Sequence, residues 1–202
     1  MQTSQPVATM IAATIAGAVA ALGWFVTKFL DRRQKRAEFR RAYIQQQIEE
    51  FYGPIHGLLS QILAANHLKH RIFEKCQLDD EAKTKTDRYF EEKYFLPLHA
   101  RLREIVESKL YLVEGVAMPE SLWRYLEHSL QEASQHALWF EYGVNTISLR
   151  GESFPNEIFR FIKETLDRLM IEYEVNVQEL KTGYFAPTSV SNVPAEDQRN
   201  MA

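Results

Sequence analysis

The chain has 202 residues, 46% hydrophobic and 25% charged, which is ordinary for a globular protein and long enough for one domain with additional segments. Its charges are unevenly distributed. Residues 1–27 carry none, residues 28–41 carry a net +5, and, since the whole chain is −3, residues 42–202 carry −8. The acidic charge of residues 42–202 argues against nucleic-acid binding by that part of the chain. The chain has a single cysteine, Cys76, which excludes a disulfide within the chain.

Residues 7–27 form a run of twenty-one uncharged residues, VATMIAATIAGAVAALGWFVT. As a helix rising about 1.5 Å per residue, this run crosses a hydrocarbon layer of about 30 Å. Trp24, Phe25 and Phe29 lie at its C-terminal end, where aromatic rings favour the headgroup region. A cleaved signal peptide conflicts with the uncharged start MQTSQP, and a buried core helix conflicts with apolar residues on every face. We therefore predict a short external N-terminus over residues 1–6 and a transmembrane helix over residues 7–30.

Small residues recur every four positions in two adjacent rows of this helix. Such small-xxx-small rows allow two helix backbones to approach closely in a bilayer, so they predict a homo-oligomer. The same spacing also arises by chance in an alanine-rich segment, and both readings stay open. The predicted oligomerisation stripe consists of Ala8, Ala12, Ala13, Ala16, Gly17, Ala20 and Ala21.

Basic residues follow the uncharged run, and we predict a basic juxtamembrane helix over residues 31–51. Because positive charge favours the cytoplasmic side, the N-terminus is expected outside and the C-terminus in the cytoplasm of a bacterial inner (plasma) membrane. Each charge near anionic lipid contributes about 1 kcal/mol, which makes membrane lipids a predicted partner and nucleic acid the less favoured one. The predicted headgroup contacts are Lys28, Arg32, Arg33, Lys35 and Arg36.

The rest of the chain shows helical periodicity and no sustained alternation of period two. Predicted helices end near residue 51 and then cover residues 54–76, 84–113, 119–143 and 155–182, with loops at 78–87 and 144–154 and a disordered tail at 183–202. Kinks are expected at Pro54 and Pro97, because proline removes a donor and clashes with the preceding turn. The predicted fold is all-α: an N-terminal transmembrane helix followed by an antiparallel four- to five-helix bundle over residues 52–182.

Apolar residues mark the faces expected to point into that bundle. A heptad-like seam, with alternating intervals of four and three, consists of Ile44, Ile48, Phe51, Ile55, Leu58 and Ile62. The third predicted helix offers Phe95, Leu98, Leu102, Ile105 and Leu110. The fourth offers Leu122, Leu126, Leu130, Ala133 and Ala137. The fifth offers Ile158, Ile162, Leu166, Leu169, Tyr173, Val177 and Leu180.

Residues 52–56 and 95–99 share the pattern aromatic-x-Pro-aliphatic-His. The pattern favours two helices that are kinked alike and pack side by side, although a duplication is conceivable. Such packing would bring His56 and His99 toward each other. Two readings of that pair stay open: buried histidines bonded to freed carbonyls, or a pH-sensitive hinge.

Catalytic motifs are missing from the sequence: it contains no phosphate loop, nucleophile elbow, Cys-x-x-Cys or His-Glu-x-x-His. His67, His70 and Glu74 share one helical face and could ligate a metal, but the polar surroundings favour a solvated face. Glu132 and His136, four residues apart, are interpreted as a surface hydrogen bond. We predict no catalytic residue, no metal and no cofactor.

Ribonucleases of the HEPN class use Arg followed four to six residues later by His. Arg124 and His128 come nearest to that pattern, but only three residues separate them, so the spacing departs from the family's. A degenerate HEPN-like nuclease is therefore kept as the second alternative function.

The runs at residues 50–59 and 108–128 resemble uncharacterised bacterial single-span membrane proteins with a helical cytoplasmic domain. The resemblance covers about residues 40–175, implies this architecture and implies no reaction. There is also an architectural likeness to the single-span helical accessory protein of RNA-targeting CRISPR systems, which assembles as a pore. The residues that match the first group in order are Phe51, Tyr52, Pro54, His128, Trp139, Phe154 and Pro155.

These observations predict a self-associating, membrane-tethered interaction or scaffold module that is not an enzyme and binds a cytoplasmic protein partner. The first alternative is an oligomeric membrane effector or pore, for example in phage defence.

Overall fold

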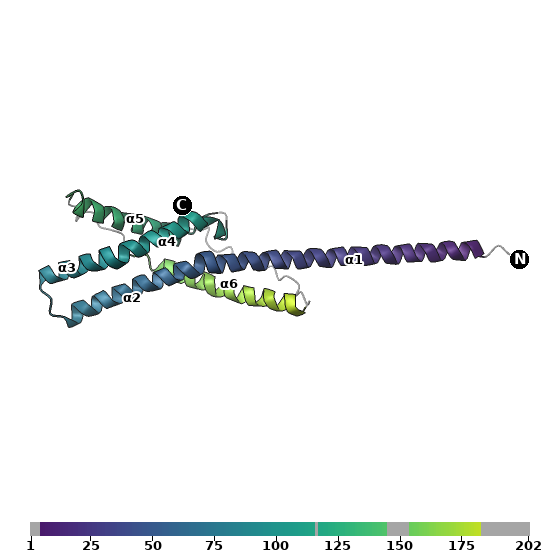
Figure 1. Ribbon diagram of the computed structural model, residues 1–202, viewed down its shortest axis with the longest axis horizontal. Coiled ribbons are helices and arrows are strands. Elements are labelled where there is room, and N and C mark those ends of the chain that lie inside the picture. Colours follow the sequence, from purple (N-terminus) through teal and green to yellow (C-terminus); the bar gives the residue numbers. More distant parts are fainter. Residues whose placement is uncertain (1–4, 116, 145–153, 183–202) are drawn as a thin grey trace, which may run out of the picture. The chain divides into compact units, whose positions relative to one another are not determined.

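The computed structural model describes residues 5–115, 117–144 and 154–182, with side chains from residue 14 onward. All regular elements in these ranges are helices and none is a strand, which confirms the all-α prediction for this part of the chain (Figure 1). The predicted tail over residues 183–202 and most of the loop at 144–154 lie outside the described residues. The chain divides into two compact units, one of residues 1–38 with 174–202 and one of residues 39–173, which we call the body.

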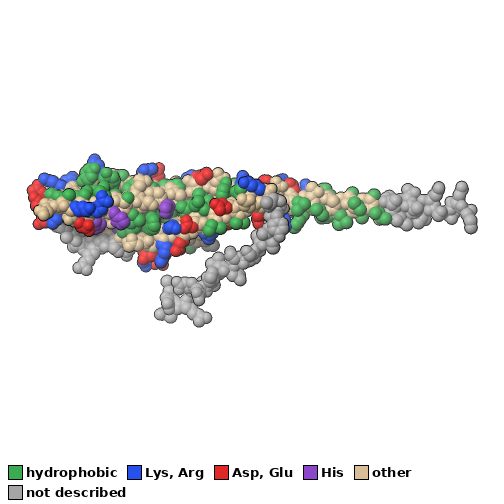
Figure 2. All heavy atoms as spheres, turned by 90° about the horizontal axis from the view of Figure 1, so that it is seen from below, with side chains coloured by type: hydrophobic (Ala, Val, Ile, Leu, Met, Phe, Trp, Pro, Cys, Tyr) green, Lys and Arg blue, Asp and Glu red, His purple; other side chains and the backbone are tan. Residues whose placement is uncertain are grey.

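Helix α1 (Gln5–Gln47) carries the uncharged segment in its first half. Its residues from 14 to 30 are all exposed, so no face of this segment is covered by protein. It is the one helix among the described residues that is long and apolar enough to cross a membrane. Figure 2 shows hydrophobic side chains along it. The large hydrophobic side chains that are more than half exposed here are Ile15, Val19, Leu22, Trp24, Phe25, Val26, Phe29 and Leu30.

Basic side chains follow on the same helix. Lys28, Arg32, Lys35 and Arg36 are exposed, whereas Arg33 is half-buried and lies 5.8 Å from the centre of the Phe29 ring. The ion pair between Lys35 and Asp31, at 3.6 Å, is weak because both side chains are more than half exposed.

A π-helical turn, η1 (Ile48–Tyr52), separates α1 from α2 (Gly53–Lys75). The Gly53 N–H donates to the Ile48 carbonyl five residues earlier, and Pro54 follows at the start of α2. A Cβ atom at Gly53 would lie 2.6 Å from that carbonyl oxygen, so only glycine fits this turn. The wider turn gives the proline ring room that a regular α-helix denies it.

The same arrangement recurs where α3 (Asp80–Phe90) meets α4 (Leu96–Lys109). The π-helical turn η2 (Glu91–Phe95) lies between them, the Leu96 N–H donates to the Glu91 carbonyl, and Pro97 follows. The sequence echo therefore corresponds to two helices interrupted alike, and α2 and α4 contact each other in the body.

Helix α3 corrects the prediction of a loop at residues 78–87. The Asp79 carboxylate accepts a hydrogen bond of 2.8 Å from the Ala82 N–H, which makes Asp79 an N-cap, and Asp80 and Glu81 stand in the first turn. Negative charge at a helix N-terminus is favourable because it faces the positive end of the helix dipole. The polarity of this stretch thus reflects a helix start.

The predicted seam contributes five residues to the buried core of the body, and other helical residues of the body supply the rest. Five of the six seam residues are at most 4% exposed, and Ile48 packs against them partly buried. Two apolar predictions on other helices are wrong: Leu110 is 37% and Leu130 is 61% exposed. Leu110 begins the 3₁₀ turn η3 (Leu110–Leu112), which changes the helical phase, so that Leu112 is buried instead.

Helix α5 (Glu120–Phe140) contacts α4 and buries Leu122, Tyr125, His128 and Ser129. The face that points inward therefore includes polar residues in place of Leu130. The helix ends before Gly143, whose φ of +67° lies in the left-handed region that glycine tolerates.

Helix α6 (Glu157–Thr182) completes the core with Ile158, Ile162 and Leu169, all fully buried. Its first turns lie against the π-turn region, where the Phe159 ring is 5.4 Å from the His56 ring.

Candidate functional site

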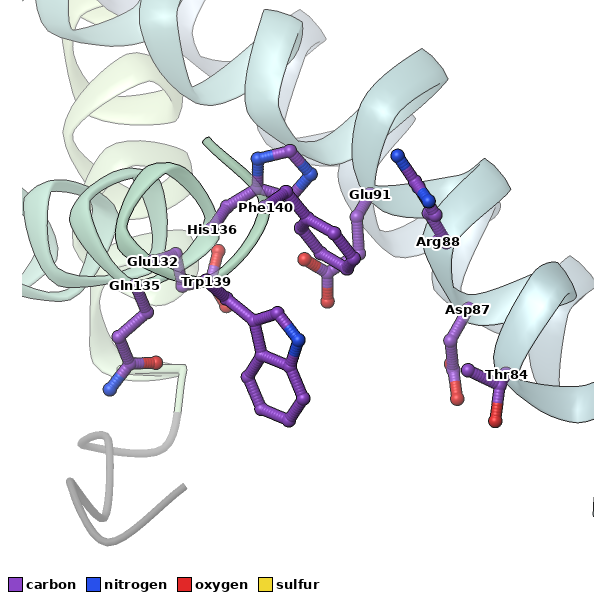
Figure 3. Close-up of a pocket in the computed structure, with 9 residues that line it drawn as sticks. All are labelled: Thr84, Asp87, Arg88, Glu91, Glu132, Gln135, His136, Trp139 and Phe140. Atoms are coloured by element: carbon purple, nitrogen blue, oxygen red, sulfur yellow. The ribbon is translucent and has the colours of Figure 1, made fainter. Parts of the chain in front are cut away.

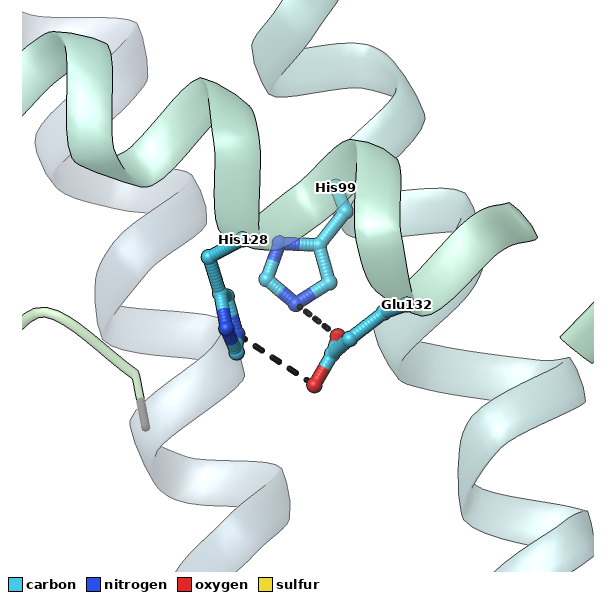
Figure 4. Close-up of side chains that lie close together, drawn as sticks. All are labelled: His99, His128 and Glu132. Atoms are coloured by element: carbon cyan, nitrogen blue, oxygen red, sulfur yellow. Dashed lines mark ion pairs between the residues drawn. The ribbon is translucent and has the colours of Figure 1, made fainter. Parts of the chain in front are cut away.

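Helices α4 and α5 bring two histidines and one glutamate together inside the body (Figure 4). His99 Nε2 lies 3.2 Å from Glu132 Oε2, and His128 Nε2 lies 3.2 Å from Glu132 Oε1. The His99 and His128 side chains are only 3% and 7% exposed. One carboxylate thus faces two buried imidazoles, one from its own helix and one from the neighbouring helix. We call these three residues the His–Glu cluster.

Each member of the cluster has a local reason for its position. His128 and Glu132 are four residues apart, so they share one face of α5. His99 lies in the first turn of α4, just after Pro97, and the π turn η2 sets the phase with which this helix begins. Arg103 of α4 links the two helices near the cluster, since its guanidinium donates a 2.8 Å hydrogen bond to the carbonyl of Ser129 in α5.

Tyr125 orients the His99 ring. Its hydroxyl lies 2.6 Å from His99 Nδ1, and the tyrosine is fully buried. Burial raises the pKa of the Tyr125 phenol well above its ordinary value, with the Glu132 charge adding to the effect, so the phenol stays neutral. A neutral hydroxyl can either donate to Nδ1 or accept from it, and this choice decides whether Nε2 of the neutral His99 ring carries the proton.

Glu132 is held as a carboxylate. Burial acts to raise its pKa, but hydrogen bonds from His128 and His99 outweigh burial and lower the pKa to about 2. Near neutral pH the cluster therefore keeps a carboxylate anion that faces two imidazoles.

A cavity of about 370 Å³ opens beside the cluster, and all three cluster residues line it. The Phe154 ring covers one side, with its centre 5.6 Å from the His128 ring. Lys69 and Glu91 also line this cavity, and Lys69 pairs with Asp87 at 3.1 Å. The cluster is thus open to small molecules or water on this side.

A second cavity, of about 470 Å³, lies between α3 and the C-terminal half of α5 (Figure 3). Glu91 and Glu132 line both cavities. Burial raises the pKa of Glu91, and the neighbouring Glu132 charge raises it further. Arg88 lies 4.4 Å from the centre of the Phe140 ring on the opposite wall. Two carboxyl groups with opposite pKa shifts therefore stand between the two cavities.

Of the histidines singled out in the sequence, only some lie near the cluster. His67, His70 and Glu74 are exposed on α2. His56 lies against Phe159, and His99 lies against Tyr125 and His128, so the structure gives these two histidines different neighbours.

The predicted Glu132–His136 hydrogen bond is replaced by other pairs: Glu132 faces His99 and His128, and His136 lies 3.8 Å from Glu92. Arg124 pairs with Glu120 at 2.7 Å on the exposed side of α5, while His128 is buried. The structure therefore gives Arg124 and His128 separate partners, and no observation favours the nuclease alternative.

Sequence reasoning missed the cluster, although α5 carries a signal for it. Tyr125, His128, Glu132 and His136 recur at intervals of three and four, which marks a polar stripe on one helical face. Leu126 and Leu130 instead predict that the face they occupy points inward, because apolar residues are usually the buried ones. The partner His99 lies on another helix, and no local pattern links it to α5.

Two imidazole nitrogens and a carboxylate form a ligand set that can hold a divalent transition-metal ion, and no other such group occurs among the described residues. Comparison with models of protein families, with curated proteins and with solved structures finds no match for this chain.

Proposed function

We propose that the chain is a membrane-tethered helical module at the inner face of a bacterial membrane, with α1 as its single span, the N-terminus outside and the body in the cytoplasm. The body would pack as an antiparallel four- to five-helix bundle that binds a protein partner and associates with further copies of this chain. One observation carries the proposal: α1 contains an uncharged run over residues 7–27, and all its large hydrophobic side chains between residues 14 and 30 are exposed. Water is a poor solvent for such a surface, and hydrocarbon is a good one.

The magnitude of this preference can be worked out from the exposed residues. Seven Ile, Val, Leu and Phe side chains in this segment each contribute about 0.3–0.6 kcal/mol to insertion, together about 2–4 kcal/mol. One arginine near the centre of a span disfavours insertion by about 2.5–3.5 kcal/mol. A single substitution can therefore cancel most of the preference.

Val19→Arg tests the tether, because Val19 lies near the middle of the span and is 63% exposed. Val175→Arg is the matched control, since Val175 is 52% exposed on α6 outside the span. After cell lysis and an alkaline wash, the wild type and Val175→Arg should stay in the membrane pellet, while a large fraction of Val19→Arg moves to the supernatant. Equal pelleting of both variants would contradict the proposal.

Self-association is proposed from the small-residue stripe. Ala16, Gly17, Ala20 and Ala21 are exposed, so the stripe is accessible to a second helix. The side chains of Ala8, Ala12 and Ala13 lie outside the described part of the structure. A Cβ atom at Gly17 meets nothing within 4 Å, so a larger residue there leaves the single chain undisturbed.

Gly17→Leu therefore tests packing between copies, and Gly23→Leu is its control. Gly23 is equally open, but it lies six residues later, which places it about 120° away around the helix. In detergent, Gly17→Leu should shift the mass toward the monomer, whereas Gly23→Leu should keep the wild-type mass. A monomeric wild type would refute self-association and, with it, the alternative of an oligomeric effector or pore.

A further inference from the structure

We propose that His99 Nε2, His128 Nε2 and the Glu132 carboxylate bind one divalent transition-metal ion, and that Zn²⁺ is the ion. These ligand atoms lie within 4.8 Å of one another and belong to two helices of the body (Figure 4). The site lies wholly within the body, so it stands or fails independently of the membrane tether.

The observed distances suit zinc. Ligand atoms at 2.0–2.2 Å from a tetrahedral zinc ion are separated by about 3.3–3.6 Å. Each imidazole Nε2 lies 3.2 Å from one of the two Glu132 carboxylate oxygens, close to this value. Small rotations of side chains suffice to bring both imidazole nitrogens and one carboxylate oxygen to this mutual separation, since one ligand atom from each residue already lies within 4.8 Å of the others.

The surroundings of His99 provide the outer partner that metal-binding histidines usually have. A nitrogen that binds a metal carries no proton, so His99 must then hold its proton on Nδ1. Tyr125 places its hydroxyl 2.6 Å from Nδ1, where the oxygen can accept that proton's hydrogen bond. Such outer partners fix the tautomer and the ring orientation of the ligand.

Three protein ligands leave the fourth position of a tetrahedral ion open. The cavity of about 370 Å³ lies against all three ligands, so a water molecule or a small anion can take that position. Two His and one Glu with an open position is a set found in zinc sites that exchange their fourth ligand. The same set also occurs with Fe²⁺, but affinity for a given nitrogen and oxygen site is higher for Zn²⁺ than for Fe²⁺.

Metal binding would also link α4 to α5. The unfolded chain does not hold these ligands together, so the free energy of binding adds to the stability of the fold. With Zn²⁺ at about 100 times its Kd, the melting temperature should rise by roughly 5–10 °C relative to chelator-treated protein.

The experiment uses the full chain, purified in detergent and stripped with a chelator. Zn²⁺ alone is then added, and the bound metal per chain and the melting temperature are measured. The wild type should bind one Zn²⁺ per chain and melt at a higher temperature. His128→Gln and Glu132→Gln should lose both effects, and Tyr125→Phe should bind about 10–100-fold more weakly. His70→Gln is the matched control, since His70 is exposed on α2, and it should behave as the wild type.

Three outcomes would overturn the assignment. The first is a wild type that shows no saturable binding and no change in melting temperature, which leaves the cluster as an ion pair only. The second is binding that survives in both His128→Gln and Glu132→Gln. The third is tighter binding of Fe²⁺ than of Zn²⁺ at equal free concentration, which would make the site an iron site. The measurements on the wild type decide the first and third questions even if a variant fails to fold.

Discussion

Because of the π turn before Pro54, we predict opposite effects on stability when alanine replaces each of two glycines four residues apart. At Gly53, an added Cβ would lie 2.6 Å from the Ile48 carbonyl oxygen, a backbone atom that cannot move without opening the turn. At Gly57, in the interior of α2, an added Cβ meets nothing within 4 Å. The two positions therefore separate local strain from helix propensity.

Gly57→Ala should stabilise the protein by about 0.5–1 kcal/mol, because alanine loses less backbone entropy on folding than glycine. Gly53→Ala gains the same propensity but forces the backbone out of its turn, and the net result should be a loss of about 1–3 kcal/mol. At about 2–4 °C per kcal/mol, Gly57→Ala should melt roughly 1–4 °C higher and Gly53→Ala roughly 2–12 °C lower than the wild type.

The assay is thermal unfolding of the full chain in detergent, followed by circular dichroism at the helix band. If both substitutions raise the melting temperature, the turn at Gly53 is an ordinary α-helical turn, and the reasoning from its close contact is refuted.

Three further predictions concern charged groups. Asp79→Ala should destabilise the protein by about 1 kcal/mol, measured by urea unfolding, because it removes the N-cap of α3; an unchanged midpoint would contradict the cap. With metal removed by a chelator, the lowered pKa of Glu132 means that its stabilising effect is complete above pH 4.5 and is lost as the pH falls toward 2. Because the side chain is 39% exposed and partly screened by solvent, the wild type should lose about 1–2 kcal/mol more free energy of unfolding than Glu132→Gln over that range. Parallel curves of unfolding free energy against pH for the two proteins would refute the ion pairs. The raised pKa of Glu91 predicts the opposite sign, so Glu91→Gln should unfold at a higher urea concentration than the wild type at pH 7, with the difference vanishing below pH 4.5; a lower midpoint at pH 7 would be the contradictory result.

The core seam could be predicted from the sequence because its signal is local. The spacing of Ile44, Phe51, Ile55, Leu58 and Ile62 places them on one side of a helix whatever the rest of the chain does, and all five are buried. Burial of a regular apolar stripe depends only on the presence of some partner surface. The pattern holds across the π turn, since Ile44 before the turn and Ile55 after it are both buried.

The start of α3 was missed for a local reason. The polarity of the stretch LDDEAKTKTD predicts a loop, yet Asp79 followed by acidic residues is a helix-start signal. Capping chemistry and loop composition use the same residue types, so hydropathy alone does not separate them.

The His–Glu cluster could not be predicted because it depends on a contact between two helices. Hydropathy ranked Leu130 above His128 for burial, although Leu130 is 61% and His128 is 6% exposed. The choice of face on α5 is decided by what α4 presents to it, and α4 presents His99, which pairs with Tyr125 of α5 and makes a polar face favourable there. Buried polar residues are stable when they are paired, and only the packing of two helices supplies the pairs.

The most direct test of membrane tethering and orientation uses the single, exposed Cys76 in the body. Intact cells and permeabilised cells are treated with a thiol reagent that does not cross membranes, and the membrane pellet is then analysed. We expect the chain in the pellet, with Cys76 labelled only after permeabilisation. Labelling of Cys76 in intact cells, or a chain found in the supernatant, would contradict the account.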